Sequence, residues 1–145
     1  MNFVKVDPDN WEHLCLLYCL LLQRRDCENI SHQRMPSFGA HAAFVRSNPY
    51  EVWYLIKVSG KWVGATYLSH RREIGIFLYG DYQGHGYGRD AVSMLMNLHP
   101  GEFYANIAPG NRASRRFFER FGFEFIQQTY HLGGKNAAQT KQTPE

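Results

Sequence analysis

The sequence has few cysteines and little net charge, and both features exclude classes of protein. Its three cysteines, at positions 15, 19 and 27, are an odd number without the paired spacing of a metal site. We therefore expect buried free thiols, with no disulfide framework and no metal. A formal net charge of +3 and a pI near 8.8 give little support for a nucleic-acid partner. This mild positive balance also suits a small anionic ligand.

Long hydrophobic runs are also absent. The longest apolar stretch, residues 14–22, is about half of the ~20 residues that a helix needs to span a bilayer. The chain opens with Met-Asn-Phe-Val-Lys, which lacks the basic and then apolar pattern of a secretory signal. We therefore expect a cytoplasmic protein without a membrane partner.

The sequence does contain alternating strand and helix patterns. Residue types typical of strands occupy 3–6, 52–58, 61–69, 73–79, 103–107 and 123–131. Helical spacing of apolar residues covers 11–25, part of 32–47, 88–97 and 113–121. This order predicts an α+β fold, a mixed α/β layer, formed by one domain over residues 1–132. Residues 133–145 have almost nothing to bury, so we expect a disordered tail there.

A glycine-rich segment separates the predicted strand 73–79 from the predicted helix 88–97. Residues 83–88 read QGHGYG, with three glycines at alternate positions. A turn from strand to helix directs free N–H groups to one point, and the helix dipole adds positive charge there. The spacing differs from the dinucleotide-binding fingerprint, and the Lys-Ser/Thr pair of a P-loop does not follow. The segment therefore predicts a site where a phosphate group approaches the backbone.

The pattern Gln83-x-x-Gly86-x-Gly88 after a strand resembles the acetyl-CoA loop of the GNAT (GCN5-related) N-acetyltransferases. Residues 76–82, IFLYGDY, are similar to that family's strand and its exit. Residues 107–114 and 117–123, IAPGNRAS and FFERFGF, look like the family's second signature. The resemblance implies a GNAT-like fold, in which helices flank a mostly antiparallel sheet that splays open at the CoA strand.

The resemblance also implies acetyl-CoA as cosubstrate and assigns residues to it. Gln83 and the amides of the loop and first helical turn would hold the pyrophosphate: Gly84, His85, Gly86, Tyr87, Gly88 and Arg89. The backbone groups of Ile76, Phe77 and Leu78 would pair with the pantetheine arm like an added strand. Asn111 would bind the same arm, and Ser114 the phosphate or ribose end. The Leu78 N–H would also polarise the thioester carbonyl.

Two residues depart from the family's catalytic pattern. Phe118 stands where many members carry the tyrosine that protonates the leaving thiolate, and Asn106 stands where some carry a glutamate base. Neither side chain can exchange a proton. A thiolate with a pKa near 8.5 can take its proton from water with little penalty.

Other residues are therefore candidates for the proton transfers. We expect Glu73 to act as the base, although an exposed strand residue paired with a neighbouring arginine fits it equally well. His70 is an alternative base. Tyr130 is our candidate acid, with Tyr79 as its alternative.

The function implied by the resemblance is acetyl transfer from acetyl-CoA directly to a primary amine of a small molecule, such as an amino sugar. We expect His41 and Trp53 at the acceptor site. Two alternatives remain open: acetylation of a protein N-terminus or lysine, and a non-catalytic acyl-CoA-binding module. The protein could be a monomer or a homodimer.

Overall fold

The computed structural model describes residues 1–24 and 34–134 of the chain. Its elements are β1 (Asn2–Lys5), α1 (Trp11–Leu22), α2 (Phe38–Arg46), β2 (Val52–Val58), β3 (Lys61–Leu68), β4 (Ile74–Leu78), the 3₁₀ turn η2 (Gly80–Tyr82), α3 (Tyr87–Leu98) and α4 (Arg112–Arg120). Most bounds lie within one or two residues of those expected. The helix predicted over residues 11–25 ends at Leu22.

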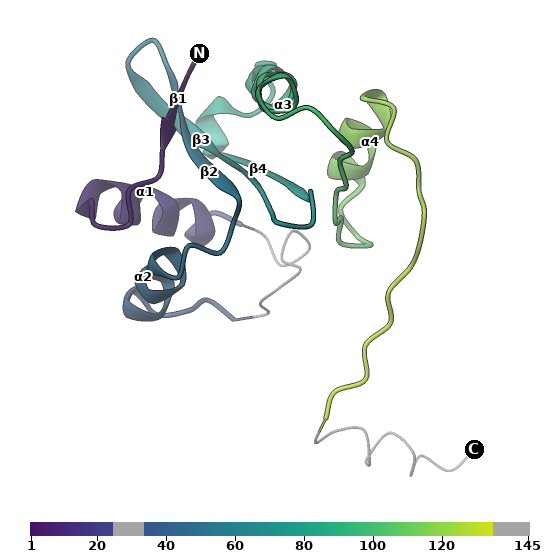
Figure 1. The fold of residues 1–145 in the computed structure, drawn as a ribbon, viewed down its shortest axis with the longest axis horizontal. Helices are drawn as coiled ribbons and strands as arrows, with labels where there is room; N and C mark the ends of the chain where they lie inside the picture. The colour runs from purple at the N-terminus through teal and green to yellow at the C-terminus, as the bar shows by residue number, and fades with distance from the viewer. Residues whose placement is uncertain (25–33, 135–145) are drawn as a thin grey trace.

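Four strands form one antiparallel sheet in the order β1-β2-β3-β4. Ser59 and Gly60, with φ of 50° and 77°, turn the chain between β2 and β3. Positive φ at both central residues gives the twist that a two-residue hairpin needs. In Figure 1, α1 and α2 lie on one side of the sheet and α3 lies on the other.

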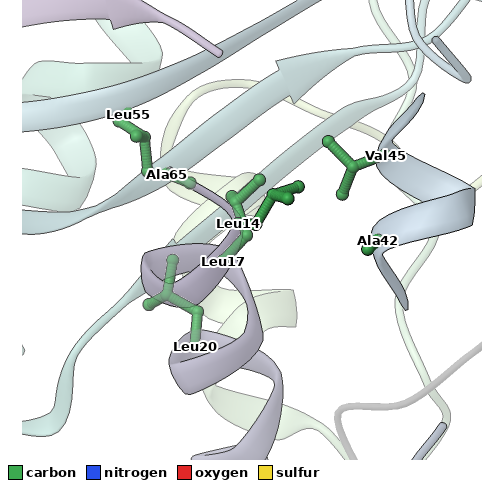
Figure 2. Packing of buried hydrophobic residues seen from close by; sticks show 7 residues of the cluster. All are labelled: Leu14, Leu17, Leu20, Ala42, Val45, Leu55 and Ala65. Carbon is green, nitrogen blue, oxygen red and sulfur yellow. The ribbon is translucent and has the colours of Figure 1, made fainter. Parts of the chain in front are cut away.

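The main core lies between the sheet and the two N-terminal helices. Figure 2 shows its buried side chains, which come from α1, α2, β2 and β3: Leu14, Leu17, Leu20, Ala42, Val45, Leu55 and Ala65. Each large aliphatic side chain buried in this way contributes roughly 1.5–3 kcal/mol. This packing fixes the end of α1 near the sheet.

A second core holds α3 and α4 against the sheet. It includes Leu68, Ile74, Val92, Leu95 and Phe118. Phe118 is 5% exposed and packs edge-on against Phe123. The two cores together position β4 between the four helices.

The strand predicted at 103–107 is reduced to a single bridge. Only Tyr104 pairs with the sheet, in parallel with Glu73. Its N–H donates to the Arg72 carbonyl, and its carbonyl accepts from the Ile74 N–H, both at 2.8 Å. Beyond this bridge β4 has no neighbour on that side within the described ranges, so the sheet splays open here. The prediction of a continuous strand was wrong because the divergence breaks the ladder.

The strand predicted at 123–131 does not form either. These residues are exposed for the most part, and no strand pairs with them in the described part of the chain. A strand needs a partner, and the sequence pattern indicates only the propensity for one. Most of the expected tail, residues 135–145, lies outside the described residues.

The expectation of buried thiols was also wrong in part. Cys15 is half-buried, Cys19 is exposed, and Cys27 lies outside the described residues. Cys15 and Cys19 both lie in α1, and Cys19 is on the solvent side of that helix. Within the described ranges, no helix is long and apolar enough to cross a membrane.

Candidate active site

The edge of β4 that faces away from β3 is open next to the bridge. The Ile74 N–H donates to Tyr104 on this edge, whereas the Tyr79 N–H donates to Val63 of β3 at 3.0 Å. Because backbone groups alternate along a strand, those of Ile76 and Leu78 also point to the open edge. The Phe77 backbone points to β3, and its side chain lines the cavity beside the edge.

The open edge ends at a contact with the glycine segment. The Gln83 side-chain amide donates to the Leu78 carbonyl at 3.1 Å. In the part of the chain that the structure describes, the Leu78 N–H has no partner. One hydrogen-bond donor is therefore left at the end of the open edge.

The glycine segment presents a series of free amides. Gly84 and Gly86 have φ of 77° and 83°, and a Cβ at either would meet no atom within 4 Å. The first helical bond of α3 runs from the Asp90 N–H to the Gly86 carbonyl. Among the described residues, the N–H groups of residues 84–89 have no hydrogen-bond partner. Positive φ and free amides at a helix start are the geometry that binds an anion.

The side chains of the glycine segment and of the first turn of α3 contact the protein itself or solvent. The His85 ring contacts the Gln83 carbonyl through Nδ1 at 2.9 Å and stacks on Tyr87. Gly88 lies against the ring of Phe117, so the start of α3 approaches α4 closely. Arg89 is exposed in the first turn of α3.

The start of α4 faces the same open edge. Asn111 caps this helix, and its Oδ1 accepts from the Ser114 N–H at 3.1 Å. Both residues line the cavity that also borders β4. The Asn111 side-chain NH₂ remains available as a donor because the cap uses only the oxygen.

A single cavity of about 480 Å³ joins these features. One end is lined by β4, the glycine segment and the start of α4. The rest of the lining comes from residues at and just after the end of α1, which contact Phe77 and Gly80, and from side chains around Glu73. The lining includes Gln23, Arg24, Tyr50, Tyr67, Glu73, Ile76, Phe77, Leu78, Gln83, Gly84, Gly88, Asn106, Asn111, Ser114 and Phe118. Both Phe118 and Asn106 therefore border it without offering a proton-exchanging group.

Glu73 is half-buried at the far end of the cavity. Its Oε2 accepts a hydrogen bond from the Ser69 hydroxyl at 3.1 Å, and its N–H donates to the same Ser69 oxygen at 3.0 Å. In the described part of the chain it forms no ion pair with Arg71 or Arg72. Arg72 instead donates to the carbonyls of Glu102, His99 and Pro100. A carboxylate held by one hydroxyl can still accept a proton.

Two tyrosines missed by the sequence analysis form a wall beside Glu73. The rings of Tyr50 and Tyr67 stack with centroids 3.8 Å apart, and both line the cavity. Burial raises the pKa of Tyr50 and of Tyr67, with Glu73 adding to the rise and Arg24 opposing it. Both hydroxyls therefore remain protonated at neutral pH. Nothing in their local sequence marks them, because Tyr50 precedes a strand and Tyr67 lies within one.

Residues just after α1 line the cavity beside the second half of β4. The Arg24 guanidinium lies 3.5 Å from the centre of the Phe77 ring. The Gln23 side-chain oxygen accepts from the Gly80 N–H at 2.9 Å, which ties α1 to the exit of β4. These contacts bring the N-terminal helix to the site.

The other candidates for the proton transfers do not line the cavity. Tyr130 is 87% exposed and does not line the cavity; its hydroxyl donates to Gln128. His70 is exposed and also lies outside the lining. The Tyr79 hydroxyl donates to the Leu16 carbonyl at 2.7 Å, a bond that ties it to α1. The structure thus brings Glu73 and Leu78 to one cavity but does not bring Tyr130 there.

His41 and Trp53 border a second, smaller cavity of about 50 Å³. It shares Leu20, Arg24, Tyr50, Tyr67 and Phe77 with the lining of the larger one. His41 is buried beside Tyr18, and Trp53 packs against Tyr50. Both candidates therefore lie behind the tyrosine wall.

Comparisons with known proteins agree with this geometry. The model of the "Acetyltransferase (GNAT) domain" family matches residues 27–124. A comparison with curated proteins finds no match. The fold is similar to that of an acetyltransferase from Thermus thermophilus, with a TM-score of 0.70, 18% identity and coverage of 87% of this chain and 88% of that one.

Two further solved structures share the fold. One is a mutant spermidine N-acetyltransferase from Vibrio cholerae, with a TM-score of 0.67 and 13% identity, covering 87% of this chain and 80% of that one. The other is a putative acetyltransferase from Salmonella typhimurium with acetyl-CoA, with a TM-score of 0.59 and 19% identity, covering 85% and 80%.

The family match spans more than half of the chain, so the chain belongs to the GNAT acetyltransferase family. It is an acetyl-CoA-dependent acyltransferase with a GNAT-like α+β fold. The residues present fit this cosubstrate. Free amides over 84–89 suit a pyrophosphate, and the open edge at Ile76 and Leu78 suits an extended amide chain.

Proposed function

We propose that the protein transfers an acetyl group from acetyl-CoA directly to the primary amine of a small molecule. One observation carries the proposal: the open edge of β4, with the free Leu78 N–H, and the Glu73 carboxylate border the same cavity. A donor for the thioester oxygen and an acceptor for an amine proton therefore border one cavity, about 16 Å apart along the strand.

The cosubstrate supplies the acetyl group as a thioester. The free amides of Gly84, Gly86 and their neighbours bind its phosphates, and the backbone of Ile76 holds the pantetheine arm. The Leu78 N–H donates a hydrogen bond to the thioester carbonyl oxygen. Such a donor is worth roughly 3–4 kcal/mol in other acyl transfers, because it strengthens as negative charge develops.

Glu73 acts as the base in this proposal. The incoming amine must be neutral to attack, so its ammonium form has to lose a proton to a nearby group. Glu73 accepts that proton through a chain of water molecules in the cavity, because about 16 Å of extended chain separates it from Leu78. Ser69 is a positioning residue, since its hydroxyl holds Oε2 and its oxygen accepts from the Glu73 N–H.

No dedicated acid is needed to complete the reaction. The leaving thiolate has a pKa near 8.5 and can take its proton from water. Tyr130 remains an untested prediction, and its exposed position does not support it. Tyr50 and Tyr67 are the protonated hydroxyls that line the cavity, so they are the first alternatives if an acid exists.

The acceptor end of the cavity supports a small amine. Its wall combines the Glu73 carboxylate, the rings of Tyr50 and Tyr67 and the Arg24 guanidinium, a polar and aromatic surface that suits a small polar molecule. The adjoining cavity bordered by His41 and Trp53 is small, so it leaves little room for a folded chain. We propose an amino sugar or a similar compound as the acceptor. A polyamine is a second candidate, favoured by the same carboxylate and aromatic wall.

An assay of free thiol release tests the proposal. The panel contains amino sugars, polyamines, a lysine peptide and a peptide with a free N-terminus, each with acetyl-CoA. We expect thiol release and an acetylated product, seen by mass spectrometry, with at least one small amine. Acetylation confined to the peptides would overturn the assignment of the acceptor. If calorimetry shows that acetyl-CoA binds but no amine is acetylated, the alternative of a non-catalytic acyl-CoA-binding module is the one that remains.

A further inference from the structure

Two side chains of opposite charge line the large cavity. Among the described residues of its lining, Glu73 carries a carboxylate, Arg24 carries a guanidinium, and the other side chains are uncharged. The proposed mechanism gives a role to Glu73 and none to Arg24. Arg24 is half-buried, and taking a charge partly out of water costs free energy unless another group compensates. A cation in this position is therefore a candidate for contact with the acceptor.

Local contacts fix the position of Arg24 just after the end of α1. Its N–H donates to the Leu21 carbonyl at 3.3 Å. The side chain of the preceding residue, Gln23, accepts from the Gly80 N–H at 2.9 Å, which ties this turn to the exit of β4. The guanidinium lies 3.5 Å from the centre of the Phe77 ring. Backbone and side chain together are thus held at the cavity.

Arg24 also lies near the place proposed for the acetyl group. Its guanidinium covers Phe77, which directly precedes Leu78 and the N–H proposed for the thioester oxygen. Neighbouring residues of a strand are only about 3.3 Å apart along it. Arg24 lines both cavities, as do Tyr50 and Tyr67. A small molecule can therefore reach the guanidinium with one group while its amine approaches the thioester.

The charge of Arg24 reaches the tyrosine wall. Burial raises the pKa of Tyr50 and of Tyr67, and the positive charge of Arg24 opposes that rise in both. Both hydroxyls stay protonated at neutral pH, so they add no negative charge that would repel an anion. The space in front of the wall is therefore one that an anionic group can enter.

We infer that the acceptor is a small primary amine that also carries an anionic group, a carboxylate or a phosphate, and that Arg24 binds this group. The inference rests on the proposed function and narrows its substrate class. A guanidinium presents five N–H donors in a planar fork, which fits a carboxylate or a phosphate through two parallel hydrogen bonds. The contact with Phe77 uses the charge and consumes none of these donors.

The inference also ranks the candidate acceptors. A polyamine carries positive charges alone, so Arg24 repels it. An unmodified amino sugar offers hydroxyl groups, whose hydrogen bonds to a guanidinium are weaker than those of an anion. An amino acid or a phosphorylated amino sugar places an anion on Arg24 and still presents one amine to the acetyl group. These two classes are the acceptors that we expect.

Matched pairs of acceptors test the inference. One pair is an amino acid and its carboxamide, and the other is an amino sugar 6-phosphate and the unphosphorylated sugar, so the pairs distinguish a carboxylate from a phosphate. In at least one pair, Arg24→Gln should lower kcat/KM for the charged member at least tenfold more than for the neutral one, about 1.4 kcal/mol. The loss should appear mainly in KM. Comparing variant with wild type cancels any difference in amine pKa within a pair.

Two variants sharpen this result. Arg24→Lys keeps the charge without the fork, so it should retain more of the preference than Arg24→Gln. Arg46→Gln is the matched control, because Arg46 is exposed in the last turn of α2 and lines neither cavity. It should change both members of a pair equally. Circular dichroism checks that each variant keeps its fold. Equal losses for the charged and neutral members in Arg24→Gln overturn the inference.

Calorimetry with coenzyme A present gives a second readout that does not depend on transfer. We expect the charged member of a pair to bind the wild type more tightly than the neutral one, and Arg24→Gln to remove that difference. Such binding without acetylation of any amine supports the anion site and refutes only the proposed transfer. Acetylation of neutral amines by a wild type that binds both members alike overturns only the inference.

Discussion

The ring of Tyr67 stacks on the ring of Tyr50 with centroids 3.8 Å apart and an angle of 2° between the planes. Gly75 makes this arrangement possible, because a Cβ there would collide with the Tyr67 ring. The ring thus lies flat across β4 and forms one wall of the acceptor end. A glycine on β4 thereby determines the position of side chains on β3 and ahead of β2.

We predict that Gly75→Ala displaces the Tyr67 ring and damages the acceptor end of the cavity. The kcat/KM for the amine should fall at least tenfold, an effect of about 1.4 kcal/mol, while acetyl-CoA affinity changes little. Steady-state kinetics and calorimetry measure the two effects. Gly39→Ala is the control, because a Cβ there meets nothing within 4 Å. If acetyl-CoA binding fell as much as kcat/KM, the assignment of Gly75 and Tyr67 to the acceptor end alone would be wrong.

Gly86→Val should weaken acetyl-CoA binding by at least tenfold, about 1.4 kcal/mol. The valine side chain enters the space in front of the free amides, where Gly86 leaves nothing within 4 Å. It also strains a backbone with φ of 83°. Gly60→Val controls for that strain, since Gly60 has φ of 77° and an equally open surrounding in the β2–β3 hairpin. If both variants bind acetyl-CoA as the wild type does, the loop does not hold the pyrophosphate.

Glu73→Gln should lower kcat/KM by about 10²-fold if Glu73 is the base. The amide keeps the shape of the side chain and its contact with the Ser69 hydroxyl but cannot accept a proton. Glu102→Gln is the matched control, because Glu102 is exposed and does not line the cavity. The comparison is made by steady-state thiol release with saturating acetyl-CoA. Equal activity of Glu73→Gln and the control would remove Glu73 from the mechanism.

Local patterns predicted the elements that carry their own signals. The β2–β3 hairpin has its turn residues, and α3 has both its periodicity and a glycine segment before it. The bridge at Tyr104 and the irregular segment 123–131 could not be predicted this way. Residues 103–107 and 123–131 have strand composition, but whether a strand forms depends on which backbone lies beside it.

The candidate site likewise has one part that local motifs indicate and one part that they do not. The part that we assign to the cosubstrate comes from two short segments, so two motifs could indicate Leu78 and Gly86 in one and Asn111 in the other. The acceptor half is assembled from the end of α1, Tyr50 and Tyr67, which are distant in sequence and meet only through packing. Tyr130 has a hydroxyl that could act as an acid, but residues 123–132 carry it away from the cavity.

The pH dependence tests whether the reaction proceeds without a dedicated acid. An alkyl amine has a pKa near 10.4, so its neutral fraction grows about tenfold for each pH unit below that value. Burial holds the pKa of Tyr50 and of Tyr67 above the usual value near 10, so both stay protonated and cause no loss of rate below it.

With an alkyl amine as acceptor, we therefore expect kcat/KM to rise steadily from about pH 6.5 towards about pH 9. Phe118→Tyr, which restores the hydroxyl at the family's usual position, should change the rate less than about tenfold, because water already protonates the thiolate. Pre-steady-state thiol release across this range measures both. A bell-shaped profile that falls between about pH 7.5 and pH 9 would reveal an ionisable acid. Tyr50 and Tyr67 would not be that acid, because burial holds the pKa of both above the usual value near 10 and they stay protonated across this range.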